Sequence, residues 1–198
     1  MSALLERDLY REKVRYETLD GKIYAMSPSP RINHNRVIGN IFTAFKRQLR
    51  GKECEVFCDG TDVFLTKKDT VIPDVFVVCN PDIVKFDGIY GTPELMVEVL
   101  SNSTKRRDKG YKFRLYERCG VKEYWIVDTE WERGAYIEVY VLNEEEKRFE
   151  LHDVYGAYYA HEVEIMKPEE RENLIFSFNS QIFPEMEFEL SEIFERIV

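Results

Sequence analysis

The sequence predicts an α/β fold in which strands and helices are mixed along the chain. The clearest signal is in residues 73–128, where two apolar strands are followed by a helix and a third strand. These four segments are 73–79, 94–101, about 103–119 and 123–128. Farther along, residues 136–142 and 148–154 alternate between apolar and polar side chains, which is typical of paired strands.

The N-terminal part is predicted to form a short helix and a hairpin. Residues 3–13 carry charges with apolar residues at helical spacing. Short strands at residues 14–16 and 22–26 flank Asp20-Gly21, which is a strong turn signal.

A longer helix is expected from residue 31 to residue 49, because apolar residues recur there at helical spacing after a proline-rich break. Residues 54–58 and 62–66 flank Asp59-Gly60-Thr61 and read as a hairpin-like pair of strands. Residues 80–92 are interpreted as a long loop, which could gate the substrate or equally form a dimer contact.

The C-terminal part is expected to add edge strands and short helical segments. Edge strands are predicted near residues 158–159, 175–178 and 188–190. A turn or helix start is predicted at residues 168–172, and a final short helix at about 191–196. The chain has no internal repeat and no low-complexity linker, so residues 1–198 are expected to form a single domain.

Composition favours a globular protein of the cytoplasm. The chain has 198 residues and is 44% hydrophobic and 14% aromatic, which is enough to build a substantial core. No apolar run approaches the length of a membrane span. Residues 1–8 carry charges where a signal peptide needs an apolar stretch, so we expect a cytoplasmic protein with no membrane partner.

All four cysteines are expected to be reduced thiols. Cys54 and Cys58 lie on one predicted strand, roughly 13 Å apart at the rise of a strand, which is too far for a mutual disulfide. Neither of them belongs to a C-x-x-C pair with the spacing of a zinc site.

Two carboxylates occupy strand positions where apolar residues are expected. In residues 94–101, Glu98 shares one face of the strand with Met96 and Leu100, and both faces read as buried. Asp74 stands at the mouth of the preceding apolar strand. A buried carboxylate costs several kcal/mol unless a cation or strong donors compensate it, so a positive partner is implied.

Lys112 is the candidate for that partner. At about 100° per residue, one side of the helix at residues 103–119 forms a stripe that faces the core, and Lys112 lies in this stripe. The inward side carries Asp108, Tyr111, Lys112, Leu115, Tyr116 and Cys119. The outer side carries Arg106, Arg107, Gly110, Arg114, Glu117 and Arg118.

Two inward carboxylates and an inward ammonium have a chemical use. Carboxylate oxygens bind hard cations such as Mg²⁺, which keeps several waters and completes its shell with phosphate oxygens. Such a cation lowers the pKa of bound water, and a lysine can orient or deprotonate that water for attack on phosphorus. The pattern predicts phosphodiester hydrolysis with Mg²⁺ or Mn²⁺ on Asp74 and Glu98 and with Lys112 acting on the water.

These motifs resemble the PD-(D/E)XK restriction-endonuclease-like superfamily, and within it the chain is similar to the Uma-two family of endonucleases. The resemblance extends over most of the chain, and residues 120–128 are its most specific part. The matching residues are Tyr16-Glu17, Asp20-Gly21, Met26-Ser27-Pro28, His34, Pro73-Asp74, Pro93-Glu94-Leu95, Glu98-Val99-Leu100-Ser101, Asp108, Lys112, Tyr116 and Gly120 to Asp128.

The resemblance implies a restriction-endonuclease-like mixed β-sheet flanked by helices. It also implies a divalent metal bound by Asp74, Glu98 and the backbone carbonyl of Val99. The chain departs from the superfamily motif at Leu100, which stands where a lysine is usual. Lys112 on the following helix is read as the substitute and hence as the catalytic lysine.

Two further site residues rest on the resemblance. Glu17 matches an additional acidic residue that many members supply from the N-terminal segment, so it is placed with the catalytic residues. His34 becomes a candidate for a second layer of the site or for a phosphate contact, although a lone histidine is more often structural.

Charge is polarised along the chain, whose net charge is -9. Residues 101–122 carry eight basic and two acidic residues, a balance of +6, whereas residues 143–198 carry fifteen acidic and five basic residues, a balance of -10. Nucleic acid is therefore the expected partner near the site, and the resemblance to endonucleases favours DNA. The candidate phosphate contacts are Lys105, Arg106, Arg107 and Lys109, for which ordinary solvated side chains are the alternative.

Three interpretations of the site stay open. The first is a metal-dependent endonuclease, and the resemblance adds the expectation of a homodimer, which would suit cleavage of two strands. The second is a catalytically inactive nuclease fold that binds nucleic acid or serves in assembly. The third is a buried ion-pair cluster, which ranks last because apolar replacements often stabilise a protein equally well.

Overall fold

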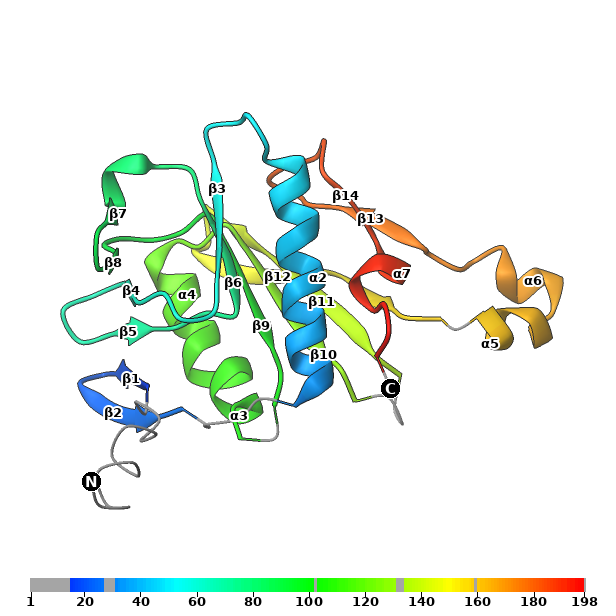
Figure 1. The fold of residues 1–198 in the computed structure, drawn as a ribbon, viewed down its shortest axis with the longest axis horizontal. Coiled ribbons are helices and arrows are strands. Elements are labelled where there is room, and N and C mark those ends of the chain that lie inside the picture. The colour runs from blue at the N-terminus through cyan, green and yellow to red at the C-terminus, as the bar shows by residue number, and fades with distance from the viewer. Residues whose placement is uncertain (1–14, 27–30, 102, 131–133, 159, 198) are drawn as a thin grey trace, which may run out of the picture.

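A six-stranded mixed sheet forms the centre of the protein, with helices on both of its faces (Figure 1). The computed structural model describes residues 15–26, 31–101, 103–130, 134–158 and 160–197. The sheet has the order β12-β11-β10-β9-β6-β3. Its strands are β3 (Glu55–Cys58), β6 (Val75–Val78), β9 (Leu95–Val99), β10 (Glu123–Asp128), β11 (Tyr136–Asn143) and β12 (Arg148–Gly156). β9 and β10 run parallel, and the other neighbouring pairs of this sheet run antiparallel.

The two faces of this sheet carry two separate apolar cores. α2 (Ile32–Gln48) covers the face to which Val97 and Val99 point, whereas Met96 and Leu100 point to the other face. That second face is covered by one continuous helical stretch. It consists of α3 (Lys105–Arg107), a π-helical turn (Asp108–Lys112) and α4 (Phe113–Cys119). The predicted α/β fold, both helices and the alternation within the β9 strand are confirmed.

A second sheet of short strands lies beside the central one, and the sequence did not reveal it. Its order is β2-β1-β5-β4-β8-β7. The strands are β1 (Tyr16–Leu19), β2 (Lys22–Ala25), β4 (Val63–Phe64), β5 (Thr70–Val71), β7 (Val84–Lys85) and β8 (Gly88–Ile89). Four of these strands have only two residues, and a two-residue strand is too short to show a periodic pattern.

Two predictions fail in this region. Residues 54–58 and 62–66 do not form a hairpin, since β3 pairs with β6 whereas β4 pairs with β5 and β8. Residues 80–92 are not a structureless loop, because they contain a 3₁₀ turn (Pro81–Ile83) and the β7–β8 hairpin. Gly88 permits this arrangement, since a Cβ atom there would lie 2.6 Å from the backbone oxygen of Asp62.

The predicted N-terminal hairpin is confirmed as β1 and β2, but its first strand is Tyr16–Leu19 rather than the predicted residues 14–16. Its turn residues Asp20 and Gly21 have φ angles of 51° and 73°, which is the left-handed region that the Asp-Gly signal predicts. The predicted helix at residues 3–13 lies outside the described residues.

The C-terminal part combines a small hairpin with short helices. The hairpin consists of β13 (Ser177–Asn179) and β14 (Glu187–Glu189), and α7 (Leu190–Ile193) packs against α2. α5 (Ala160–Ile165), which was not predicted, and α6 (Pro168–Arg171) extend away from the sheet (Figure 1). The edge strand expected near residues 158–159 does not form at Tyr158.

Buried Glu123 at the start of β10 holds the C-terminal hairpin to the core. Its carboxylate accepts hydrogen bonds from the indole of Trp125, the hydroxyl of Ser180 and the backbone N–H groups of Gln181 and Ile182. These donors compensate a carboxylate that burial would otherwise penalise.

The expectation of four reduced cysteines is wrong for two of them. Cys54 and Cys79 form a disulfide, because the antiparallel register of β3 and β6 brings residues 25 apart in sequence face to face. Cys58 and Cys119 are free thiols. No helix in the described part of the chain is long and apolar enough to span a membrane.

Removing the disulfide should destabilise the protein. Replacement Cys79→Ala releases a loop of 25 residues in the unfolded chain, for which the chain-entropy relation gives about 3.5 kcal/mol. Urea unfolding without reductant measures this loss, and Cys58→Ala is the matched control, with a much smaller effect. Titration of thiols in unfolded wild-type protein should give two before reduction and four afterwards, and four at the outset would contradict the bond.

Candidate active site

Asp74 and Glu98 lie side by side at the ends of two neighbouring strands. In the antiparallel pair of β6 and β9, Val75 stands opposite Val97, so one further step of the register places Asp74 opposite Glu98. The carboxylate of Asp74 accepts a hydrogen bond of 2.7 Å from the backbone N–H of Val99. Both carboxylates are buried, with 8% of Asp74 and 3% of Glu98 exposed.

Lys112 reaches Glu98 from the helix that covers this face. Its Nζ lies 2.9 Å from Oε1 of Glu98, 2.7 Å from Oε1 of Glu17 and 3.7 Å from Oδ1 of Asp108. Tyr116, one turn farther along, donates a hydrogen bond of 2.6 Å to the same Oε1 of Glu98. Lys112 ends the π-helical turn, a feature that often occurs at functional sites.

Glu17 joins the site from the second sheet. It is the second residue of β1, and only 2% of it is exposed. One oxygen accepts hydrogen bonds from the N–H of Ile72 and from Lys112, and the other lies 4.0 Å from a guanidinium nitrogen of Arg107. The β1–β2 hairpin thus brings a third carboxylate to the lysine.

His34 stands on the opposite side of Asp74, in the first turn of α2. Its Nε2 lies 3.5 Å from Oδ2 of Asp74, and its buried Nδ1 has no hydrogen-bond partner among the described residues. Burial alone would lower the pKa of His34, but the Asp74 carboxylate and the Val99 backbone carbonyl together raise it.

These residues surround one cavity of about 210 Å³. Its walls include the predicted residues Glu17, His34, Asp74, Glu98, Arg107 and Lys112. They also include Arg15, Met26, Arg31, Asp59, Ile72, Ser101, Ser103 and Thr104, which sequence reasoning did not assign to the site. The sequence predicts Asp108 and Tyr116 on the inward stripe of the helix but assigns them no role in the site. Their inward position is the signal that could have identified them as site residues.

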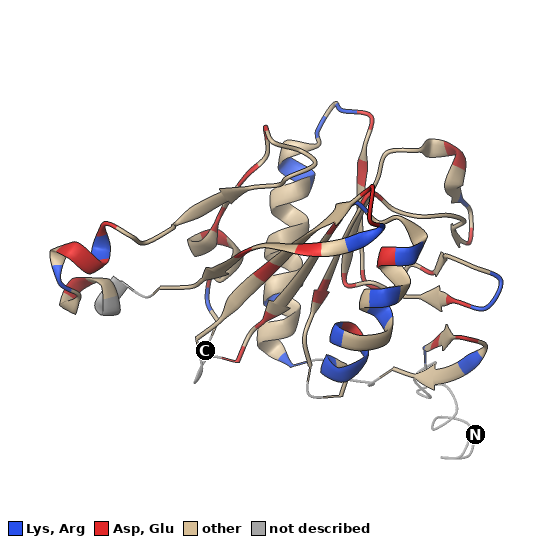
Figure 2. Ribbon diagram, turned by 180° about the vertical axis from the view of Figure 1, so that it is seen from behind, with Lys and Arg blue, Asp and Glu red and all other residues tan. Residues whose placement is uncertain are grey.

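The four basic residues predicted to contact phosphate differ in their surroundings. Lys105 pairs with Asp128 at 2.7 Å and Lys109 with Glu138 at 2.6 Å, so neighbouring acids already compensate their charges. Arg106 lines a shallow hollow on the outer side of the helical stretch, where Figure 2 shows a succession of basic segments. Of these four basic residues, Arg107 alone lines the cavity. The sequence predicts Arg107 on the outer side of the helix, but the β1–β2 hairpin packs over this side.

Charge in the cluster is unbalanced toward the negative. Burial alone would lower the pKa of Lys112, but the carboxylates of Glu98, Glu17 and Asp108 raise it well above its ordinary value. Burial raises the pKa of Glu98 and of Asp108, and the Lys112 ammonium opposes both shifts. Three carboxylates therefore share one ammonium, and the cluster would accept additional positive charge.

The oxygen donors fit a hard divalent cation. Both hydrogen bonds to Glu98 within the described chain end on Oε1, so its Oε2 has no competing donor there. Together with the carboxylate of Asp74 and the nearby backbone of Val99, this gives the small protein ligand set that Mg²⁺ uses alongside water. No group of three or more His, Cys, Asp or Glu side chains is placed to hold a metal within the described residues, so a richer ligand set is absent there.

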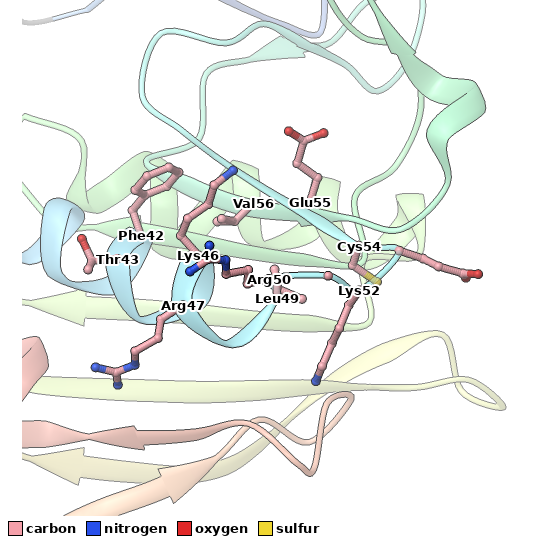
Figure 3. A pocket seen from close by; sticks show the side chains of 12 residues that line it. Phe42, Thr43, Lys46, Arg47, Leu49, Arg50, Lys52, Cys54, Glu55 and Val56 are labelled. Carbon is pink, nitrogen blue, oxygen red and sulfur yellow. The ribbon is translucent and has the colours of Figure 1, made fainter.

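A larger hollow of about 840 Å³ lies at the far end of α2 and contains none of the predicted residues (Figure 3). Lys46, Arg47, Arg50 and Lys52 contribute to its walls. Basic residues at the C-terminal end of a helix complement its dipole, and Arg47 and Lys52 pair with Glu192 and Glu185. A structural role accounts for these charges.

Known proteins resemble the chain in sequence and in fold. Residues 4–176 match the Uma2 family model, which is described as "Putative restriction endonuclease". The "Uncharacterized protein slr1290" of Synechocystis sp. (strain ATCC 27184 / PCC 6803 / Kazusa) is 36% identical over 121 residues, which is 60% of this chain and 63% of the relative's length. A crystal structure from Anabaena variabilis ATCC 29413, described as "a putative nuclease belonging to DUF820", matches over 100% of both chains with a TM-score of 0.66 and 14% identity, which shows a shared fold.

Replacing the lysine should destabilise the fold in a pH-dependent way. Lys112→Met leaves buried carboxylates without their ammonium, which costs about 3–5 kcal/mol near neutral pH. Without Lys112 the already raised pKa of Glu98 rises further, so the folded variant binds more protons than the unfolded chain and loses stability as pH increases.

Urea unfolding at about pH 5 and about pH 8 measures this effect. The free energy of unfolding of Lys112→Met should fall farther below that of the wild type at the higher pH. Lys109→Met is the matched control, because Lys109 belongs to an ion pair near the surface and should cost about 1 kcal/mol or less. A deficit for Lys112→Met as small as that of the control would show that the cluster does not depend on the ammonium.

Proposed function

Since the chain belongs to the Uma2 family, described as "Putative restriction endonuclease", we propose that it is a metal-dependent endonuclease that hydrolyses phosphodiester bonds of nucleic acid. The resemblance drawn from the sequence motifs is confirmed at the level of the family. One observation carries the proposal: Lys112 lies within 2.9 Å of Glu98 and 2.7 Å of Glu17 in a cavity that Asp74 also lines.

Asp74 and Glu98 are the proposed metal ligands, with the backbone carbonyl of Val99 as a third. The hydrogen bond from the Val99 N–H fixes one oxygen of Asp74, and Tyr116 and Lys112 fix one oxygen of Glu98. Side chains held in this way keep the geometry that a cation needs without rearrangement. Bound Mg²⁺ or Mn²⁺ would polarise the phosphate and lower the pKa of a coordinated water.

Lys112 is the proposed residue that orients the attacking water and stabilises charge on the phosphate. Its ammonium is a donor at neutral pH, because the surrounding carboxylates hold its pKa high. Glu17 holds Nζ of Lys112 beside Glu98 and so positions the lysine. His34 and Arg107, on two sides of the cavity, are the proposed phosphate contacts.

Loss of the glutamate charge should abolish cleavage. Glu98→Gln preserves the size of the side chain but weakens metal binding, so Mg²⁺-dependent nicking of supercoiled plasmid DNA should fall by about 100-fold or more. Glu150→Gln, on exposed β12, is the control and should cleave like the wild type. Full activity of Glu98→Gln would remove Glu98 from the mechanism.

Metal binding separates an active enzyme from an inactive nuclease fold. Calorimetric titration with Mn²⁺ should show binding to the wild type, weakened at least about tenfold by Asp74→Asn. The Glu150→Gln variant should bind like the wild type. Absence of binding to intact protein would favour the alternative of a non-catalytic module that binds nucleic acid or serves in assembly.

A further inference from the structure

A cation–aromatic pair lies beside the cavity. The guanidinium carbon of Arg107 lies 5.3 Å from the centre of the Tyr24 ring, and Arg107 itself lines the cavity. Within the described chain its other charged contact is the 4.0 Å approach to Glu17, and its guanidinium makes no hydrogen bond there. Its N–H groups are therefore available for an incoming phosphate. We refer to Tyr24 and Arg107 together as the lip.

Strand register places the tyrosine beside the catalytic cluster. Glu17 and Tyr24 are direct partners in the β1–β2 pair, so their side chains leave the same face of the hairpin. Glu17 points to Lys112, and Tyr24 stands next to it with 37% of its surface exposed. The neighbouring Tyr16 points to the other face, because successive strand residues alternate.

The reactive groups are recessed in the cavity beside this lip. Glu17, Glu98 and Asp74 are 2%, 3% and 8% exposed, and the cavity of about 210 Å³ is smaller than a pocket that encloses a whole drug-sized ligand, roughly 300 Å³ or more. For a phosphate to reach these groups, the nucleic-acid strand must bend so that the phosphate enters the cavity while its base stays outside. A base in a duplex must first leave its stack, which costs a few kcal/mol, whereas an unpaired strand avoids this cost.

We propose that the lip selects unpaired nucleic acid, with the Arg107 guanidinium binding the phosphate that enters the cavity and the Tyr24 ring stacking on its unpaired base. Planar bases stack on aromatic rings and on guanidinium planes alike, so a base can extend the stack that Tyr24 and Arg107 already form. This inference rests on the proposed nuclease function and names the substrate class of that site.

Fluorescence anisotropy with a labelled oligothymidylate and a duplex of equal length, in EDTA to prevent cleavage, tests the proposal. The wild type should bind the single strand more tightly than the duplex. Tyr24→Leu should weaken single-strand binding about tenfold and change duplex binding less than about twofold, because only the unpaired base uses the ring. Arg107→Gln should weaken binding of both probes, since it removes a phosphate contact.

Two conservative variants give matched controls. Tyr24→Phe keeps the ring and should bind the single strand like the wild type. Tyr16→Leu removes an aromatic ring that is 53% exposed on the other face of the same hairpin, and it should have no effect. Both tyrosines are exposed, so their replacement leaves the core intact.

Two results would overturn the inference. One is a wild type that prefers the duplex, and the other is a Tyr24→Leu variant that binds the single strand as tightly as the wild type. If Glu98-dependent cleavage persists in either case, the proposed nuclease function stands and only the selection of unpaired strands fails. If the protein neither binds nor cleaves either probe, the proposed function fails with it.

Discussion

The ion cluster around Lys112 is the interaction on which the site depends. One ammonium joins three parts of the chain: Glu98 on the central sheet, Glu17 on the second sheet and the helix that carries Asp108 and Lys112 itself. All four side chains are nearly inaccessible to water, so each charge requires the others. The cluster thus holds the two sheets and the helix in register around the cavity, and it sets the charge that a cation would meet.

The second sheet contributes more to the site than its short strands suggest. It supplies Glu17 to the cluster, and its β1–β2 hairpin covers the start of the helical stretch, where it meets Arg107. The central sheet holds both proposed metal ligands, since Glu98 lies in β9 and Asp74 directly precedes β6. Proposed metal ligands on the central sheet and a proposed substrate contact, Tyr24, on a peripheral hairpin would suit an enzyme, because substrate binding could then vary without disturbing the metal geometry.

Charge distribution agrees with this division. The helical stretch carries seven of the eight basic side chains of residues 101–122, yet Lys105 and Lys109 pair with acids of β10 and β11. The positive balance of residues 101–122 is therefore only partly available to a ligand, and of these basic residues Arg107 and Lys112 line the cavity. The acidic C-terminal part is fixed to the core through Glu123, whose hydrogen bonds are structural.

Local periodicity by itself determined the α/β class, the two main helices, and the inward direction of Glu98 and Lys112, because strand alternation and the helical stripe depend only on neighbours along the chain. Only the tertiary structure decided the contacts between distant segments. These contacts follow from pairing of strands far apart in sequence. Pairing of β1 with β5 brings Glu17 and the hairpin with Tyr24 to Arg107 and the cavity, and pairing of β3 with β6 brings Cys54 to Cys79. Strands of two residues leave no pattern from which such pairing could be inferred.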